Sequence, residues 1–253
     1  MIASLRMYEW PEMRRSLNKY WQLIKYELLE SGLSAPESLD LMLNEKDAWI
    51  HPNLVLGHTC GMPYRKFLYN KVSLIGTPNF GIMGCPAGYY NSVFITNIQD
   101  NRSDLIEFKN SVFAYNMENS QSGLAAAFDH TQKIGFWFSN RLISGGHTKS
   151  SKLVANGQAA ITCLDSVSWR LLQRYSLIGE KLKVIAETKP SPGLPYISAI
   201  GYNSKIHFYA IKRAIKNLDM IDKKVLGIID LEWISKDTYL EVSNPPSSAT
   251  YGD

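Results

Sequence analysis

The stretch from Ser111 to Thr131, SVFAYNMENSQSGLAAAFDHT, decides the fold class that the sequence predicts. Its first residues, Ser111 to Tyr115, have the composition of a short buried strand, and Gly123 to Thr131 have that of a helix rich in small residues. Between them, Asn116 to Gly123 form a turn of polar and small residues. A strand that passes through a Ser- and Gly-containing turn into a helix is typical of α/β proteins.

The rest of the chain repeats this alternation of short apolar runs and helical spacing. Pro11 to Ser31 is predicted as the first helix, because Pro lies in its opening turn and apolar residues recur at steps of three and four, and Gly32 would end it. Further helices are predicted at Ser150–Asn156, Ser166–Tyr175 and Ile206–Leu218. The other predicted strands are Ile2–Met7, Leu54–His58, Val72–Gly76, Ser92–Thr96, Ala159–Leu164, Val184–Thr188 and Ile197–Ala199. This order favours an α/β fold with largely parallel sheets.

Composition excludes several classes of protein. The 253 residues are 45% hydrophobic and 20% charged, which is ordinary for a globular protein. The net charge of +4 comes from Lys and Arg that are scattered among acids, which argues against nucleic-acid binding. No apolar run approaches the roughly 20 residues that span a bilayer. Residues 1–10 lack the pattern of a secretory signal, which leaves a cytoplasmic protein and a processed periplasmic form both open.

Neither a metal site nor an organic cofactor is predicted. Cys60, Cys85 and Cys163 lie far apart without CxxC spacing, so free thiols are expected, although a contact between Cys60 and Cys85 is left open. The sequence contains no P-loop, dinucleotide fingerprint or nucleophile elbow. The five histidines show no ligand spacing; they are His51, His58, His130, His147 and His207.

The turn before the helix of small residues is a candidate anion site. Backbone amides and the positive end of the dipole at a helix start attract an anion, and Ser120 and Ser122 add hydroxyl donors. Gln121 adds an amide, and Gly123 lets the backbone approach a ligand closely. The alternative is an ordinary serine N-cap without a ligand.

Two further polar residues follow predicted strands. His147 lies in SGGHTKS, a Gly-containing turn before a predicted helix, and either ring nitrogen could donate to an anion. Asp165 ends an apolar run and precedes a helix, at the edge where open α/β sheets bind ligands. An ordinary turn residue and a helix N-cap are the alternatives. A carboxylate near an anion would accept the hydrogen of a protonated oxyanion, which sulfate cannot supply.

Two aromatic loops are candidates for the walls of a ligand cleft. Tyr8 follows the first predicted strand in MYEWP, and Tyr90 and Ser92 lie in the Gly-rich segment GCPAGYYNS. Tyrosine combines a flat apolar face with a polar tip, which suits a cleft that closes on a small ligand. Packing in the core is the alternative for each ring.

Eight blocks spread over the chain resemble the phosphate/phosphite/phosphonate substrate-binding proteins of ABC importers, the PhnD-like branch of the type II periplasmic binding proteins. The blocks, in chain order, are SLRMYEWPE, LGHTCGMPY, LIGTPNF, GCPAGYYNS, AYNMENSQSG, SGGHTKS, AAITCLDSVSW and TKPSPGLPYI. Each block alone is a weak signal, whereas eight in this order are fairly specific. The chain departs from the family pattern where it has Ser-Gln-Ser in place of Ser-Thr-Ser, and this leaves the ligand open.

The resemblance implies two α/β lobes, each with a mixed, mostly parallel sheet flanked by helices, and a ligand cleft between them. It predicts one lobe from residues 1–95 with 185–253 and a second from residues 96–184. The ligand-binding residues that it implies are Tyr8, Tyr90, Ser92, Ser120, Gln121, Ser122, His147 and Asp165.

The function that we expect from the sequence is that of a monomeric, non-enzymatic solute-binding protein, which binds phosphate, phosphonate or phosphite and presents it to an ABC importer. Its compartment is periplasmic by resemblance. Two alternatives stay open at this point. One is a cytosolic lyase or cofactor-precursor enzyme on the same scaffold, with His147 and Asp165 as acid and base. The other is a ligand sensor.

Overall fold

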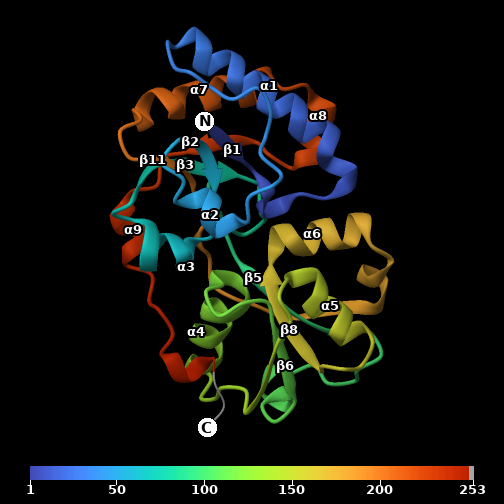
Figure 1. Cartoon of the computed structure of the whole chain (residues 1–253). Coiled ribbons are helices and arrows are strands. Elements are labelled where there is room, and N and C mark those ends of the chain that lie inside the picture. Colours follow the sequence, from blue (N-terminus) through green and yellow to red (C-terminus); the bar gives the residue numbers. More distant parts are fainter. Residues whose placement is uncertain (251–253) are drawn as a thin grey trace. The chain divides into compact units, whose positions relative to one another are not determined.

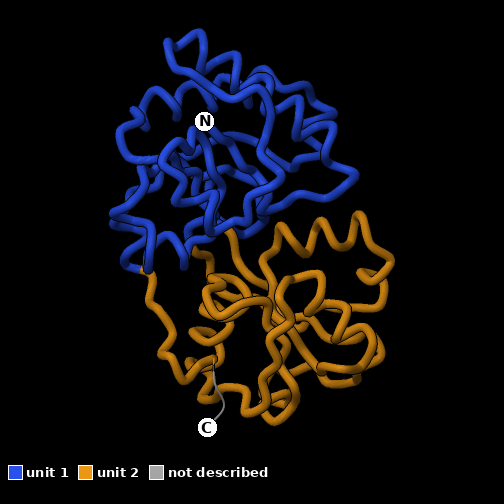
Figure 2. The backbone as a smooth tube through the Cα atoms, viewed as in Figure 1, with its two compact units in different colours: residues 1–89, 192–241 blue, residues 90–191, 242–253 orange. Residues whose placement is uncertain are grey.

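The computed structural model describes residues 1–250, which divide by their contacts into two compact units (Figures 1 and 2). Unit 1 consists of Met1–Tyr89 and Pro192–Glu241, and unit 2 consists of Tyr90–Ser191 and the segment that begins at Val242. The sequence placed its boundaries at 95/96 and 184/185. The structure divides the chain elsewhere because those two positions lie inside a pair of hydrogen-bonded strands, β5 and β9, that both belong to unit 2.

Unit 1 contains a five-stranded mixed sheet in the order β1-β2-β11-β3-β12. Strands β1 and β2 are parallel, and β11 lies antiparallel between β2 and β3, so neighbouring strands are more often antiparallel than the sequence suggested. The strands are β1 (Ile2–Ser4), β2 (Leu54–His58), β3 (Val72–Asn79), β11 (Tyr196–Ala199) and β12 (Asp230–Glu232). A two-stranded sheet pairs β4 (Tyr89–Tyr90) with β10 (Ser191–Pro192), where the chain passes between the units.

Helix α1 (Arg14–Glu30) covers part of unit 1 by packing along α7 (Ser204–Asn217) and α8 (Met220–Leu226), as Figure 1 shows. Its buried residues Tyr20, Trp21, Ile24 and Leu28 recur at the predicted spacing. Gly32, at φ 77°, follows the last turn, as the sequence predicted. The other helical segments of the unit are η1 (Arg6–Tyr8), η2 (Pro11–Met13), α2 (Glu45–Trp49), α3 (Gly61–Pro63), η3 (Tyr64–Leu68) and α9 (Lys236–Leu240).

Unit 2 is built on a second five-stranded sheet in the order β7-β6-β8-β5-β9. Strands β7, β6 and β8 are parallel, and β5 is antiparallel to β8 and β9. The strands are β5 (Ser92–Asn97), β6 (Val112–Tyr115), β7 (Asn140–Ile143), β8 (Ile161–Asp165) and β9 (Leu182–Glu187). The helical segments are η4 (Leu105–Phe108), η5 (Gln121–Ala125), α4 (Ala126–Lys133), α5 (His147–Ala155), α6 (Ser166–Tyr175), η6 (Leu177–Lys181) and η7 (Ser247–Ala249). In Figure 1 the strands β5, β8 and β6 run between α4 and α5.

Aromatic side chains dominate the core of unit 2. Phe113 of β6 stacks on Phe138 with ring centroids 4.4 Å apart and planes 5° from parallel. Phe94, Phe108 and Phe136 belong to the same buried cluster. These large rings hold the sheet against its helices and fix the strands whose ends carry the polar residues described below.

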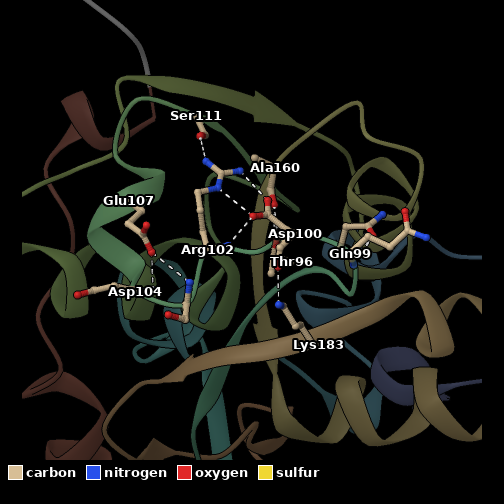
Figure 3. Close-up of polar contacts among 11 residues, drawn as sticks. Thr96, Gln99, Asp100, Arg102, Asp104, Glu107, Ser111, Ala160 and Lys183 are labelled. Carbon is tan, nitrogen blue, oxygen red and sulfur yellow. Dashed lines mark hydrogen bonds and ion pairs between the residues drawn. The ribbon is translucent and has the colours of Figure 1, made fainter.

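The loop after β5 is held by a polar network around Arg102 (Figure 3). The guanidinium donates to both carboxylate oxygens of Asp100 and to Ser111 Oγ, and it lies 3.9 Å from the ring centroid of Phe108. Lys183 of β9 donates to the backbone oxygen of Asp100. Because the loop is tied to β9 and to the residue before β6, it is an ordered part of unit 2.

The segment after α9 leaves unit 1 and packs on unit 2. Trp137 Nε1 donates to the backbone oxygen of Ala249 at 3.2 Å, and Tyr115 Oη donates to that of Thr250 at 3.2 Å. Arg141 Nη2 donates to the backbone oxygen of Ser248. The sequence assigned this tail to the first lobe, and these contacts explain why the structure groups it with unit 2 instead.

Most of the predicted elements occur, with shifted ends. Leu54–His58 and Ser166–Tyr175 have the predicted bounds. The first strand is shorter than predicted, because Arg6–Tyr8 form a 3₁₀ turn instead of continuing it. The helix predicted at Ser150–Asn156 begins earlier, at His147.

Candidate functional site

Four chain segments bring polar residues to one edge of the unit 2 sheet. Strands β6, β7 and β8 are parallel, so their carboxyl ends meet at this edge and lead into Asn116, the Ser144–Gly146 loop and Asp165. Strand β5 is antiparallel to β8 and therefore begins at the same edge, where Ser92 lies opposite Asp165. The strand order alone thus gathers the polar residues that the sequence singled out in this unit.

The segment that contains Ser120 and Ser122, here called the serine turn, leads into a wide helical turn. Ser120 caps it, since its Oγ accepts the amide of Gly123 at 2.9 Å. The amide of Ala125 donates to the backbone oxygen of Ser120, five residues earlier, so the turn is a π-turn, a rare feature that often marks functional sites. Ser120, Gln121 and Ser122 are all buried. The first amides of the helical segment point out of its N-terminus, as an anion site requires.

Asn116 packs directly against Gly123. A Cβ atom on Gly123 would lie 2.0 Å from Asn116 Oδ1 and 3.1 Å from His147 Cε1. No side chain fits there unless Asn116 moves, so the glycine is required for close approach even though its φ is not positive. Asn116, which is 4% exposed, therefore lies between the serine turn and the histidine.

The loop before α5 is fixed by backbone bonds to the end of β6. The amide of Ser144 donates to the oxygen of Tyr115 at 2.8 Å, and the amide of Gly145 donates to that of Asn116 at 2.9 Å. Ser144 Oγ also bonds to Ser150 Oγ of the helix at 2.6 Å. Gly145, at φ 82°, supplies the left-handed turn that brings the chain back to start the helix at His147.

His147 Nε2 lies among three polar groups. Ser122 Oγ is 3.0 Å away, Asn116 Nδ2 is 3.4 Å away, and Asp165 Oδ2 is 3.6 Å away. Burial lowers the pKa of His147 below its ordinary value, and the carboxylate of Asp165 opposes this effect. The net effect favours the neutral form of the imidazole. Its Nδ1 is buried and has no hydrogen-bond partner among residues 1–250.

Asp165 caps helix α6. Its Oδ1 accepts the amide of Ser168 at 2.8 Å, and its Oδ2 accepts the hydroxyl of Ser168 at 2.7 Å. The N-cap that the sequence analysis named as the alternative is thus present in the structure. A cap does not exclude a second contact, because each carboxylate oxygen has two acceptor positions. The ligand-binding role of Asp165 stays a prediction.

Ser92 begins β5, and Tyr90 ends β4 two residues earlier. Ser92 is 1% exposed, and its hydroxyl bonds to the thiol of Cys163 on the neighbouring strand β8. Burial, with a further contribution from Asp165, raises the pKa of that thiol well above its ordinary range. Tyr90 is buried and precedes the strand by two residues. Direct ligand contacts from these two residues stay predictions.

Tyr8 belongs to unit 1. It ends the turn η1, and its ring packs edge-on against Phe80 and His58 at centroid distances of 5.1 and 5.7 Å. Tyr196 also packs against His58, and all four rings line one small cavity within unit 1. A contribution of Tyr8 to a ligand site stays a prediction.

Asn116 was missed as a separate candidate. In the sequence it was only the first residue of a polar turn, yet it follows strand β6 directly, and Asp165 likewise ends strand β8. Its position at the carboxyl end of β6 was the available signal.

The cysteines, possible metal ligands and long helices of the described residues were compared with the sequence expectations as well. Across residues 1–250 none of the three cysteines forms a disulfide, so the contact left open between Cys60 and Cys85 is not a bridge. No group of three or more His, Cys, Asp or Glu side chains in this range is arranged to hold a metal ion. No helix among these residues is both long enough and apolar enough to cross a bilayer.

Residues 60–238 match the model of a protein family described as ABC transporter, phosphonate, periplasmic substrate-binding protein. The fold is similar to that of PhnD1 from Prochlorococcus marinus in complex with methylphosphonate, at 17% identity and a TM-score of 0.68, with 89% of this chain and 90% of that chain covered. A binding protein component of an ABC phosphonate transporter from Pseudomonas aeruginosa is similar at 16% identity and a TM-score of 0.60, with 92% and 80% covered. XAC2383 from Xanthomonas citri, bound to ATP, has 10% identity and a TM-score of 0.67, with 90% of each chain covered. A comparison with curated proteins finds no significant match.

These findings confirm the resemblance inferred from the sequence and the type II periplasmic-binding-protein fold. The family consists of substrate-binding transport proteins, so the prediction that the chain is not an enzyme is confirmed at this level. A family of this kind implies a small ligand and a transporter permease as partners, and it is described as periplasmic.

Proposed function

Because the chain belongs to the phosphonate family of ABC transporter periplasmic substrate-binding proteins, we propose that it binds a small oxyanion at the polar edge of the unit 2 sheet and presents it to an importer. The observation that carries this proposal is the 3.0 Å contact between Ser122 Oγ and His147 Nε2 at the N-terminus of a helical segment. The residues that we assign to the ligand are Ser120, Gln121, Ser122, His147, Asp165, Tyr90 and Ser92, with Tyr8 from unit 1.

The proposed chemistry is hydrogen bonding to the oxygens of a tetrahedral anion. Hydroxyls of the serine turn and amides at its N-terminus supply donors, and the helix dipole adds a favourable field. Hydrogen bonds to a charged group contribute about 1.5–3 kcal/mol each. A few of them, after the cost of ordering the ligand, support a micromolar dissociation constant, or about −8 kcal/mol.

Asp165 narrows the class of oxyanion in this proposal. A buried carboxylate repels a fully ionised anion but accepts a hydrogen bond from a protonated one. Phosphate, phosphonate and phosphite can carry such a hydrogen near neutral pH, whereas sulfate cannot. We therefore expect the protein to prefer the phosphorus oxyanions to sulfate.

Calorimetric titration of the purified protein with methylphosphonate, phosphate, phosphite and sulfate tests the proposal. The expected result is micromolar binding of at least one phosphorus oxyanion, with sulfate at least tenfold weaker. In Ser122→Ala, the loss of one hydroxyl donor should weaken that binding by about tenfold, which corresponds to 1.4 kcal/mol.

The matched control is Ser139→Ala, which removes an exposed serine hydroxyl elsewhere in unit 2. Its affinity should equal that of the unchanged protein. If none of the four anions produces heat or raises the melting temperature, the proposal is wrong. Equal losses in Ser122→Ala and Ser139→Ala would place the ligand away from the serine turn.

Two parts of the proposal need their own measurements. Light scattering of the free and ligand-bound protein should give the mass of one chain, since we propose a monomer. Recovery of the bound anion unchanged after prolonged incubation separates a binding protein from the lyase or precursor enzyme considered above. Conversion that is lost in His147→Ala would favour the enzyme.

A further inference from the structure

Asn116 connects three parts of the candidate site. Its backbone oxygen accepts the amide of Gly145 at 2.9 Å, which holds the loop before α5. Its Nδ2 lies 3.4 Å from His147 Nε2. Its Oδ1 is buried, has no hydrogen-bond partner among residues 1–250, and lies against Gly123. The side chain thus lies with its NH₂ group toward the imidazole and its Oδ1 toward Gly123.

This arrangement decides which nitrogen of the neutral imidazole carries the hydrogen. The NH₂ group of Asn116 can only donate, so it needs a lone pair on Nε2. Ser122 Oγ, at 3.0 Å, can donate to the same lone pair. Asp165 Oδ2, at 3.6 Å, is too far for a hydrogen bond from Nε2. Without ligand the hydrogen therefore belongs on Nδ1.

Two acceptors consequently face each other with no hydrogen between them. One is the lone pair of His147 Nε2, and the other is the carboxylate of Asp165. Among residues 1–250, Asp165 is the acid whose carboxylate lies within 4.0 Å of a ring nitrogen of His147. The groups that contact the ring from the serine turn and from the end of β6, Ser122 and Asn116, are neutral. On helix α5 itself, the ammonium group of Lys149 lies near Gly145. An oxyanion that enters here meets a carboxylate that repels it and an imidazole nitrogen that offers it no hydrogen.

We propose that binding of an oxyanion is coupled to the gain of one proton at the His147–Asp165 pair, and that Asn116 is the positioning residue that keeps this proton off Nε2 until the ligand arrives. This inference rests on the proposed function. The lone pair of Nε2 takes the proton, and the resulting N–H donates to the ligand oxygen. A fully ionised ligand draws this proton from the solvent, whereas a protonated ligand brings a hydrogen that its oxygen donates to the carboxylate of Asp165, so that Nε2 needs no added proton.

Proton uptake is measured directly by calorimetry of methylphosphonate binding in buffers of different ionisation enthalpy. At about pH 9, where methylphosphonate is almost fully ionised, the heats should show about one proton taken from the buffer for each ligand bound. Near pH 6 the ligand brings its own hydrogen, and the uptake should fall toward zero. Binding at about pH 9 with no proton uptake would overturn the inference and leave the proposed function intact.

Nitrogen NMR of ¹⁵N-histidine-labelled protein tests the empty site without any ligand. The expected signature for His147 without ligand is a hydrogen on Nδ1 and none on Nε2, with hydrogens on both nitrogens once methylphosphonate is bound at about pH 9. A hydrogen on Nε2 in the empty site would refute the role of Asn116. This measurement also separates the two proposals, because it remains decisive if no anion binds at all.

The variant Asn116→Asp tests the positioning role. It replaces the donor by a carboxylate close to Nε2, which should raise the titration midpoint of His147 in the empty protein by about one to three pH units. The matched control Asn110→Asp makes the same change at an exposed position of unit 2 and should leave the midpoint unchanged. Equal midpoints in the unchanged protein and in Asn116→Asp would contradict the proposal.

Discussion

The substitution Gly123→Ala is a demanding test of the site geometry, because two opposing effects can be weighed from the structure. Position 123 lies in a helical segment, where alanine is favoured over glycine by about 0.5–1 kcal/mol. If nothing else mattered, the variant would be the more stable protein.

The contacts at this position predict the opposite result. The new Cβ atom would lie 2.0 Å from Asn116 Oδ1 and 3.0 Å from Asn116 Cγ, whereas non-bonded carbon atoms in contact normally lie about 3.5–4.0 Å apart. The amide of Asn116 must turn away, which breaks its contact with His147 and leaves buried polar groups unpaired, at a cost of about 1–3 kcal/mol. The net expectation is a loss of about 1 kcal/mol, or about 2–4 °C in melting temperature for a chain of this size.

Urea denaturation followed by circular dichroism measures this loss, and two further variants identify its cause. In the Asn116→Ala background the atom responsible is gone, so Gly123→Ala should cost nothing or stabilise slightly. Gly146→Ala is the steric control, because its φ of 168° is open to any residue and a Cβ there meets nothing within 4 Å. A Gly123→Ala protein as stable as the unchanged chain, or the same cost with and without the Asn116 side chain, would refute the reasoning.

Three further predictions concern the two units separately. Arg102→Met removes the forked ion pair with Asp100 and the contact with Phe108, so the free energy of unfolding of unit 2 in urea should fall by about 1–2 kcal/mol. Because Arg102 holds the pKa of Asp100 below its ordinary value, the difference in stability between the two proteins should shrink as the pH falls and Asp100 is protonated. A difference that stays the same in acid would count against the ion pair. Burial lowers the pKa of His58 to about 3, so below the ordinary histidine pKa of about 6.5 the unfolded chain binds a proton that the folded chain does not. The urea midpoint should therefore decrease from pH 7 to pH 4.5, and this decrease should be smaller in His58→Gln; equal decreases would show that His58 is not the group responsible. Deletion of the chain after Val242 removes the acceptors of Trp137 and Tyr115, so the melting temperature should fall by a few degrees and tryptophan emission should shift to the red, and an unchanged melting curve would contradict the packing role of the tail.

The sequence predicted the elements of the site better than their contacts. The strand that ends at Tyr115, the serine turn and the helix that follows all occur, because short-range signals such as Ser at a helix start and Gly in a turn act within a few residues. The helix after Asp165 has the predicted bounds for the same reason, since Asp is a strong N-cap.

Contacts between segments that are distant in the chain were harder to predict from the sequence. Ser92 pairs with Asp165 across neighbouring strands because β5 is antiparallel to β8. The hydrophobic periodicity of the sequence does not reveal the relative direction of two strands. The position of Asn116 against Gly123 depends on packing between two loops. The shortened first strand reflects tertiary context as well, because its apolar pattern continued through Met7 while the chain turned after Ser4.

The wide turn at Ser120 has a consequence for chain length. A five-residue hydrogen-bonded step contains one residue more than an α-helical step, so the segment from Ser120 to Ala125 is equivalent to a helix start with a single insertion. A sequence shorter by one residue there would wind regularly and rotate its second serine by about 100° about the helix axis. Spacing, as much as residue type, thus determines whether a hydroxyl reaches the imidazole, and alignments across this turn should place their gaps accordingly.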